Sequence, residues 1–268
     1  IIHHLCSGLG LFRKYGVKKV IEREKNAYNT SNVVVVLPTY NEAENIEKMI
    51  LMIESLKVNS EIEILVVDDS SPDGTPEIVR KLQRKYGNIT LIVRPRKMGL
   101  GTALKDAFSF LASLPNKHRY VITMDADFSH NPRDIPRLLE LAKKGYDVVI
   151  GSRYVKGGKT KGWLPMRVII SRIANKIARI LIKIPIKDFT SGFRCYSMEY
   201  ILNVLPSLHS QTYEIQIETL KQAQLLNAKV AEVPIVFENR KKGKSKLSAN
   251  EIQSFLRYMI KLLVEKVV

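Results

Sequence analysis

A chain of 268 residues with 45% apolar residues is large enough for one sizeable domain with its own hydrophobic core. Its net charge of +17, from 43 basic against 26 acidic residues, indicates anionic partners: nucleic acid, phosphorylated small molecules or an acidic membrane surface. The two cysteines form no Cys-x-x-Cys pair, which argues against a disulfide framework or a zinc site, and no stretch reaches the ~18 to 20 apolar residues that a membrane span needs.

The first 31 residues are an appendage to which we assign no role. They begin with Ile rather than Met, which indicates a fragment or a processed form. The opening stretch IIHHLCSGLGLF is too short and too polar for a signal sequence. We therefore expect the main domain to begin near residue 32.

From residue 32 onward, apolar strands alternate with amphipathic helices. The first strand, VVVVLP at 33–38, is a β-branched run of the kind that is buried on both faces of a parallel sheet. Further strands are predicted at 62–69, 89–93, 120–124 and 147–152, and helices at 41–56, 76–86, 101–112 and 134–144. This alternation predicts an α/β domain on a mostly parallel sheet, which binds ligands at the carboxyl ends of its strands.

Polar residues follow three of these strands at the end where a ligand would bind. The first strand leads into PTYNE, and two others end in paired acids: Asp68 with Asp69, and Asp125 with Asp127. A single acid after a strand is most often a turn former or a helix cap. Because three strand ends share the pattern, one common site explains it more economically.

The pair Asp125 and Asp127 lies in MDADFSHNP, at residues 124–132. Two carboxylates separated by one residue can share a hard divalent cation, since Mg²⁺ and Mn²⁺ prefer oxygen ligands and often hold substrate phosphates as well. Ser129 and His130 could add a ligand, although an ordinary loop role explains His130 better. Gly99 and Gly101 lack the third glycine of a dinucleotide fingerprint, so a tight turn is the better interpretation there.

Basic residues gather in two later segments. MRVIISRIANKIARILIKIPI at 166–186 has apolar residues at helical spacing with basic residues between them, and residues 152–187 include ten basic residues and no acidic one. This pattern is typical of an amphipathic helix at a membrane interface, and a core helix with a solvated basic face is the alternative. FENRKKGKSKLS at 237–248 crowds five bases around Gly243, which predicts either a lid over phosphates or a solvated loop.

The chain resembles the dolichyl-phosphate (polyprenyl-phosphate) mannose synthases of glycosyltransferase family 2 in five motifs: VLPTYNEAENI, VVDDSSPDGT, MDADFSHNP, GSRY and NRKKGKSKL. The resemblance implies a GT-A (nucleotide-diphospho-sugar transferase) domain at 32–248. The residue pattern of 249–268 predicts a C-terminal amphipathic helix, for which a core helix with a solvated face is the favoured interpretation. The resemblance further implies transfer of mannose from GDP-mannose to dolichyl or polyprenyl phosphate, with inversion and with Mg²⁺ or Mn²⁺. It also implies a position at the cytoplasmic face of a membrane and leaves room for a membrane-anchoring subunit.

The resemblance assigns a role to each matching residue. The residues implied in donor binding are Pro38, Tyr40, Glu42, Asp68, Asp69, Asp125, Arg240 and Lys246. The implied metal ligands are Asp125, Asp127 and Ser129. Some relatives have a glutamine at the position of Ser129. The residues implied in binding the acceptor phosphate are Arg153, Arg167 and Ser171. The implied catalytic set is Asp127, Arg153, Arg167 and Ser171.

A phosphate acceptor agrees chemically with these roles. A phosphate monoester has a second pKa of about 6, so it is already largely dianionic at neutral pH and attacks without a general base. The main requirement is to bring two polyanions together, and metal and arginine meet it by positioning and charge neutralisation. Asp188 could act as a base, but pairing with Arg194 or a loop turn explains it equally well, and we leave it out of the catalytic set.

Two alternatives compete with this interpretation. A glucosyl-, GlcNAc- or aminoarabinose transferase acting on the same lipid, with UDP-sugars as the donors for the first two, is the nearest one, and NRKKGKSKL favours mannose. A nucleic-acid-binding protein would account for the basic charge. Its lysines and arginines, however, lack interleaved aromatic residues, and paired acids would repel a phosphate backbone in the absence of metal. We therefore expect no nucleic-acid partner.

Overall fold

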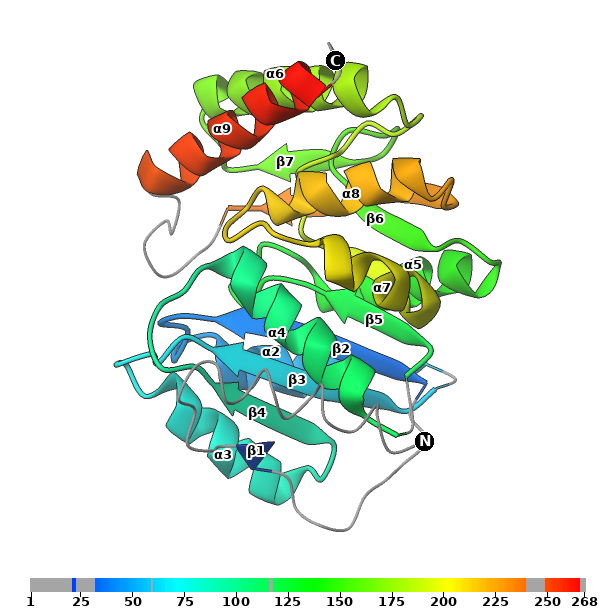
Figure 1. Cartoon of the computed structure of the whole chain (residues 1–268). Coiled ribbons are helices and arrows are strands. Elements are labelled where there is room, and N and C mark those ends of the chain that lie inside the picture. Colours follow the sequence, from blue (N-terminus) through cyan, green and yellow to red (C-terminus); the bar gives the residue numbers. More distant parts are fainter. Residues whose placement is uncertain (1–20, 23–31, 59, 116–117, 240–248, 266–268) are drawn as a thin grey trace.

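The computed structural model describes residues 21–22, 32–58, 60–115, 118–239 and 249–265. Within these ranges, helices pack on both faces of an eight-stranded sheet, and a separate two-stranded sheet completes the fold (Figure 1). The strands are β1 (Ile21–Glu22), β2 (Val33–Thr39), β3 (Ile62–Asp68), β4 (Ile89–Val93), β5 (Tyr120–Thr123), β6 (Val148–Ser152), β7 (Lys159–Lys161), β8 (Arg194–Ser197), β9 (Val230–Pro234) and β10 (Val236–Glu238). The helices are α2 (Ile46–Glu54), α3 (Thr75–Lys85), α4 (Leu100–Ser113), α5 (Ile135–Lys143), α6 (Pro165–Ile182), α7 (Met198–Val204), α8 (Ile215–Leu225) and α9 (Ala249–Glu265), with 3-10 helices η2 (Pro132–Asp134) and η3 (Leu205–Ser207).

The main sheet is mostly parallel, as predicted, with the strand order β1-β4-β3-β2-β5-β8-β6-β9. β4, β3, β2 and β5 run parallel, while β8 is antiparallel to both of its neighbours and β1 is antiparallel to β4. The chain adds β3 and β4 on one side of β2 and then adds β5 on the other side. This reversal opens a crevice between the carboxyl ends of β2 and β5, where ligands bind in open α/β sheets.

Strand β2 divides its side chains between two hydrophobic cores. Val33, Val35 and Leu37 belong to one core, and Val34 and Val36 belong to the other. Successive side chains of a strand point to opposite faces of the sheet, so a continuous apolar run is needed where helices cover both faces. The buried strand that the sequence predicts at 33–38 is thereby confirmed.

Helix α6 begins one residue before the predicted helix and ends four residues earlier, at Ile182. Lys183 caps it in the left-handed conformation, with a φ of 56°. Its N–H donates to the carbonyl of Arg179, which closes the last turn. In Figure 1, α6 lies at one end of the molecule beside α9 and across from α8, with which it also makes contact.

The two terminal segments are described only in part. Of residues 1–31, β1 is described, and it extends the sheet by pairing Ile21 with Ile92. Helix α9 buries Met259 and Leu262 in the core and leaves other apolar side chains exposed. None of the helices in the described part of the chain is both long and apolar enough to span a bilayer.

Candidate active site

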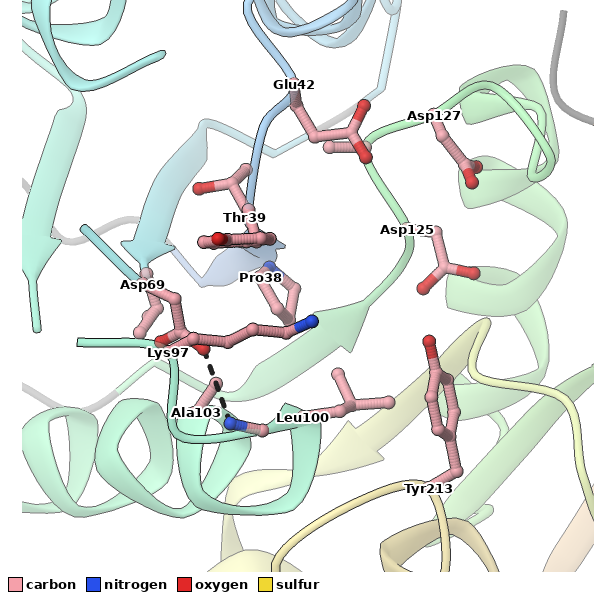
Figure 2. A pocket seen from close by; sticks show the side chains of 14 residues that line it. Pro38, Thr39, Glu42, Asp69, Lys97, Leu100, Ala103, Asp125, Asp127 and Tyr213 are labelled. Carbon is pink, nitrogen blue, oxygen red and sulfur yellow. Dashed lines mark hydrogen bonds between the residues drawn. The ribbon is translucent and has the colours of Figure 1, made fainter. Parts of the chain in front are cut away.

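A pocket lies at the carboxyl ends of β2, β3 and β5, where the strand order reverses (Figure 2). Tyr213 closes it from the loop before α8, with its hydroxyl pointing toward Asp125 in Figure 2. The residues that line the pocket are Pro38, Thr39, Tyr40, Glu42, Val67, Asp69, Lys97, Gly99, Leu100, Ala103, Asp125, Ala126, Asp127 and Tyr213.

The loop after β2 brings Pro38, Tyr40 and Glu42 to the pocket. The Glu42 carboxylate is nearly buried and accepts a hydrogen bond of 2.8 Å from Asn45 Nδ2. The Lys97 ammonium lies 4.8 Å from the centroid of the Tyr40 ring, so a cation and an aromatic face meet at the pocket wall. These contacts hold the loop against the first turn of α2 and the segment before α4.

The paired acids after β3 separate in space. Asp68 is fully buried behind the pocket, where it accepts hydrogen bonds from Thr39 Oγ1 at 2.8 Å and from Ser71 Oγ at 2.6 Å. Burial raises the pKa of the Asp68 carboxyl above its ordinary value. Asp68 therefore ties β2 to the β3 turn and is not among the residues that line the pocket, and its donor-binding role stays a prediction.

Asp69 faces the pocket and organises its wall. Its carboxylate forms a buried ion pair with Arg94 and accepts a hydrogen bond of 3.0 Å from the N–H group of Met98. It also accepts one of 3.4 Å from the N–H group of Gly99 (Figure 2). Gly99 has a φ of +96°, and a side chain there would lie 2.6 Å from the Gln211 carbonyl. The glycine thus serves a tight turn, as predicted, and this turn also lines the pocket.

Asp125 and Asp127 project into the pocket from the loop after β5 (Figure 2). The Asp125 side chain is 41% exposed, and Asp127 is nearly buried, with its Oδ1 accepting from the Ser129 N–H at 2.9 Å. Ser129 itself is buried and lines neither this pocket nor the cavity beside it. The structure thus brings two of the three implied metal ligands to the pocket.

His130 stabilises the same loop from behind. It lies between the rings of Phe193 and Phe237, and its Nδ1 accepts a hydrogen bond of 3.1 Å from the Asp125 N–H. Burial lowers the pKa of the imidazole, so His130 is neutral at pH 7. These contacts favour the loop role for His130 over a metal role.

The two pocket carboxylates fit a cation that binds together with a phosphorylated ligand. Within the described residues, no cluster of three or more His, Cys, Asp or Glu side chains could hold a metal ion. Mg²⁺ usually takes one or two carboxylates and completes its shell with water and substrate phosphates. Asp125 and Asp127 are such a partial set of hard oxygen ligands.

A second polar cluster surrounds Arg153, which is buried against Asp188. Arg153 donates to both carboxylate oxygens of Asp188, at 2.8 Å through Nε and 2.6 Å through Nη2, and Nη2 also donates to Thr190 Oγ1 at 2.6 Å. Its Nη1 has no hydrogen-bond partner among the described residues. Asp188 and Thr190 therefore fix the orientation of the guanidinium.

Asp188 therefore pairs with Arg153 and not with Arg194. Arg194 is buried elsewhere and donates to the carbonyls of Phe189, Ser191 and Gln216. Burial would raise the pKa of the Asp188 carboxyl, but the charge and hydrogen bonds of Arg153 hold it below its ordinary value. Asp188 is ionised and positions the arginine, which argues against a role as a base.

Arg167 and Ser171, on α6, join Arg153 around an aromatic cluster. The Arg167 guanidinium lies 4.1 Å from the Trp163 ring centroid, and that of Arg153 lies 5.4 Å from the same centroid. Ser171 Oγ accepts a hydrogen bond of 2.7 Å from Tyr154, whose ring also contacts Arg153. The structure thus brings together the three residues expected to hold the acceptor phosphate.

A larger cavity lies beside the pocket, and none of Arg153, Arg167 and Ser171 is among its lining residues. It shares Asp127 with the pocket and extends past Phe128 and Glu238 to Asn239. Asn239 Oδ1 accepts a hydrogen bond of 3.4 Å from Arg167. Asn239 thereby links the wall of this cavity to the arginine cluster.

Three residues at the two sites were not predicted from the sequence, and two predicted ones lie outside the described residues. Lys97, Trp163 and Tyr213 stand in loops without a local motif, and only their aromatic or basic character could have suggested them. Trp163 in particular has a buried Nε1 donor without a hydrogen-bond partner among the described residues. The predicted lid residues Arg240 and Lys246 fall in 240–248, which the structure does not describe.

The buried pair of Arg153 and Asp188 gives a test of stability. Asp188→Asn should lower the free energy of unfolding at pH 7 by about 3 to 5 kcal/mol, because it leaves a buried cation without its counter-charge. A carboxyl whose pKa is depressed by folding stabilises the protein above its unfolded pKa of about 4, and this contribution is lost as the pH falls through the folded value. In urea unfolding, the free energy of unfolding should therefore decrease less on acidification in the variant than in the wild type.

The control for this experiment is Glu47→Gln, which removes an exposed acid from α2. It should leave the urea midpoint at pH 7 close to that of the wild type. An Asp188→Asn variant as stable as the control would contradict the structural importance of the pair.

The fold and the site define a class of enzyme. A mostly parallel sheet flanked by helices, with an Asp-x-Asp pair at the strand reversal, is the arrangement of the GT-A glycosyltransferases. Residues 34–205 match the model of glycosyl transferase family 2. The chain belongs to glycosyl transferase family 2, which confirms the resemblance drawn from its motifs.

Two curated relatives match most of the chain. A polyprenol monophosphomannose synthase from Mycolicibacterium smegmatis is 36% identical over 226 residues, which are 84% of each protein. A dolichol-phosphate mannosyltransferase from Pyrococcus furiosus is 39% identical over 233 residues, which are 86% of this chain and 63% of the relative. The chain thus spans less than two thirds of the Pyrococcus protein.

Solved structures of more distant proteins share the fold. Glucosyl-3-phosphoglycerate synthase from Mycobacterium tuberculosis, in complex with Mn²⁺, UDP and glucosyl-3-phosphoglycerate, gives a TM-score of 0.61 at 20% identity and covers 91% of this chain and 86% of its own. A mannosyltransferase from Pyrobaculum calidifontis, in complex with GDP-Man and Mn²⁺, gives 0.58 at 18% identity and covers 97% and 73%. At these identities the likeness establishes the GT-A fold alone.

Proposed function

We propose that this enzyme transfers mannose from GDP-mannose to the phosphate of a dolichyl or polyprenyl lipid, with inversion at the sugar. The observation that carries the proposal is the pairing of two sites. One is the acidic pocket and the other is the cluster of arginines, and the cavity that shares Asp127 with the pocket reaches Asn239, which accepts a hydrogen bond from Arg167. The names of the two curated relatives support this lipid and this sugar.

The acidic pocket binds the nucleotide sugar. Tyr40, Lys97 and Tyr213 offer aromatic and cationic surface to the nucleotide, and Asp125 and Asp127 hold Mg²⁺ or Mn²⁺ against its diphosphate. When bound, the metal neutralises negative charge on the leaving nucleotide. Asp69 keeps the wall of this pocket in place through Arg94 and the N–H groups of Met98 and Gly99.

The arginine cluster binds the acceptor phosphate. Asp188 fixes two nitrogens of Arg153, so Nη1 presents a fixed donor and a full positive charge to the phosphate. Arg167 supplies a second charge, and Ser171 supplies a hydroxyl. A dianionic phosphate held by these groups attacks the sugar without a general base, so the protein acts mainly by positioning and charge neutralisation.

Helix α6 faces the membrane in this proposal. Its outward side exposes a row of apolar side chains, among them Met166, Ile170 and Ile173, which are 53% to 64% exposed. Arg167 and Ser171 on the same helix then lie at the depth where a lipid phosphate is found. The enzyme works at the cytoplasmic face of the membrane, and the exposed rows of α6 and α9 also suit a membrane-anchoring subunit.

The test is a choice among donors. Radiolabelled GDP-mannose, UDP-glucose and UDP-GlcNAc are offered separately with polyprenyl phosphate and Mg²⁺ or Mn²⁺, and labelled lipid is extracted. We expect product from GDP-mannose only, and only with metal. Labelled lipid from a UDP-sugar would establish the alternative donor, and no labelled lipid from any of the three would contradict a transferase to lipid phosphate.

A further inference from the structure

A groove beside α6 gathers cations on the flank of the helix that turns away from Arg167. Its lining includes Arg172, Lys176, Arg179 and Lys187 around the buried Arg153, and none of its lining residues, all of which lie in the described part of the chain, is acidic. Because an α-helix turns about 100° per residue, Arg172 is rotated by roughly 140° from Arg167 about the axis of α6. The groove thus opens on a different side of α6 from Arg167, while Arg153 and Tyr154, which donates to Ser171, border both the groove and the proposed acceptor site.

The charge of this groove is not balanced within the described protein. Arg172, Lys176, Arg179 and Lys187 are exposed and form no ion pair with another described residue. Two carboxylates lie beside the groove: that of Asp188 is paired with Arg153, and that of Glu232 accepts from the backbone N–H groups of Lys187 and Asp188. Basic residues four apart on a helix repel one another, and only Arg179, in the last turn, is favoured by the helix dipole. An external anion would relieve this repulsion.

The groove adjoins the apolar row of α6. Three kinds of surface follow one another around the helix: a buried side with Ala178 and Ile182, the basic flank, and then the exposed apolar row that includes Ile169, Ile173 and Ile180. A soluble phosphate would use only the basic flank. A molecule with an anionic head and apolar tails matches the two neighbouring surfaces together.

We propose that this groove binds the phosphate headgroup of an anionic phospholipid, a lipid distinct from the acceptor. The inference rests on the proposed function in one respect, namely that α6 lies on a membrane. A headgroup in the groove fixes the rotation of α6 about its own axis, because the apolar row then faces the acyl chains. Arg167 and Arg153 are thereby held at headgroup depth, ready for the phosphate of the acceptor.

The test compares two triple variants that remove equal charge. Arg172→Gln/Lys176→Gln/Arg179→Gln empties the basic flank of α6, and Lys81→Gln/Arg84→Gln/Lys85→Gln removes three exposed bases from α3, at the opposite end of the molecule in Figure 1. Binding is measured by co-sedimentation with phosphatidylcholine vesicles, with and without phosphatidylglycerol. We expect the α6 variant to lose about 100-fold in affinity for the anionic vesicles, at ~5-fold per charge, and the α3 variant to stay within about 3-fold of the wild type.

Two further measurements complete the test. On neutral vesicles the wild type and both variants should bind alike, through the apolar row. Transfer to a short-chain, water-soluble polyprenyl phosphate without vesicles should be unchanged in the α6 variant, which shows that the arginine cluster is intact. If the wild type makes no product from this soluble acceptor, the proposed function fails, while the vesicle result still decides the headgroup site.

Two outcomes would overturn the proposal. Equal losses in the α6 and α3 variants would mean that overall charge, and not a site, attracts the protein to anionic lipid. Enhanced binding by the wild type to vesicles doped with polyprenyl phosphate, without any enhancement by phosphatidylglycerol, would assign the groove to the acceptor.

Discussion

Asp127→Asn is expected to reduce sugar transfer by about 100-fold or more, since it removes the charge of the more buried of the two proposed metal ligands. The asparagine keeps an oxygen for the Ser129 N–H, so the loop after β5 should retain its shape. Without ligands the variant should be as stable as the wild type, because the change also removes repulsion between Asp125 and Asp127. The measurements are kcat and KM for the donor and the melting temperature.

The binding measurement separates a ligand role from a structural one. Mn²⁺ with GDP should raise the melting temperature of the wild type by mass action and leave that of Asp127→Asn unchanged. The matched control is Glu140→Gln, which removes one negative charge from the exposed face of α5. Near-normal transfer by Asp127→Asn in the presence of metal would remove Asp127 from the metal site.

Arg153→Lys is expected to reduce kcat/KM for the acceptor by about 100-fold while donor binding stays within about 2-fold of the wild type. A lysine carries one point charge on a flexible stem. It cannot hold both oxygens of Asp188 and at the same time present a separate donor to the phosphate, as the fork of Arg153 does. The lysine keeps the counter-charge for Asp188, so it avoids most of the instability expected of Arg153→Ala.

The control for this change is Arg80→Lys, which conserves the exposed ion pair of α3 with Glu77. It should leave the kinetic constants of both substrates unchanged. If Arg153→Lys turned over the acceptor at the wild-type rate, the bidentate geometry would be irrelevant to catalysis. If it also lost donor binding, the two sites would not be independent.

The first half of the fold could be predicted well because its signals are local. The strands from β2 to β6 are continuous apolar runs, and the helices between them carry one apolar face, so periodicity alone identifies them. The last part of the sheet could not be read in this way. β8 enters between β5 and β6 in the antiparallel direction, and its position depends on packing against segments far away in the sequence.

The paired acids after β3 show a limit of motif matching. Asp68 and Asp69 are neighbours in the sequence, and both were expected to bind the donor. Successive residues at a strand end point in opposite directions, so that Asp68 is buried among hydroxyls while Asp69 faces the pocket. Which of the two acids faces the pocket depends on which side of the strand end packs against Thr39 and Ser71, and that packing is set by the tertiary structure.

The family, the α/β architecture, the Asp-x-Asp pair and a basic amphipathic helix could all be inferred before the structure was known. Motifs and periodicity are properties of the amino-acid sequence alone. Contacts between residues that are distant in the sequence could be identified only from the tertiary structure. Asp188 pairs with Arg153 across 35 residues rather than with nearby Arg194, and Tyr213 reaches the pocket from the loop before α8. Such contacts depend on packing between elements, and burial of a charge then selects the partner that can satisfy it.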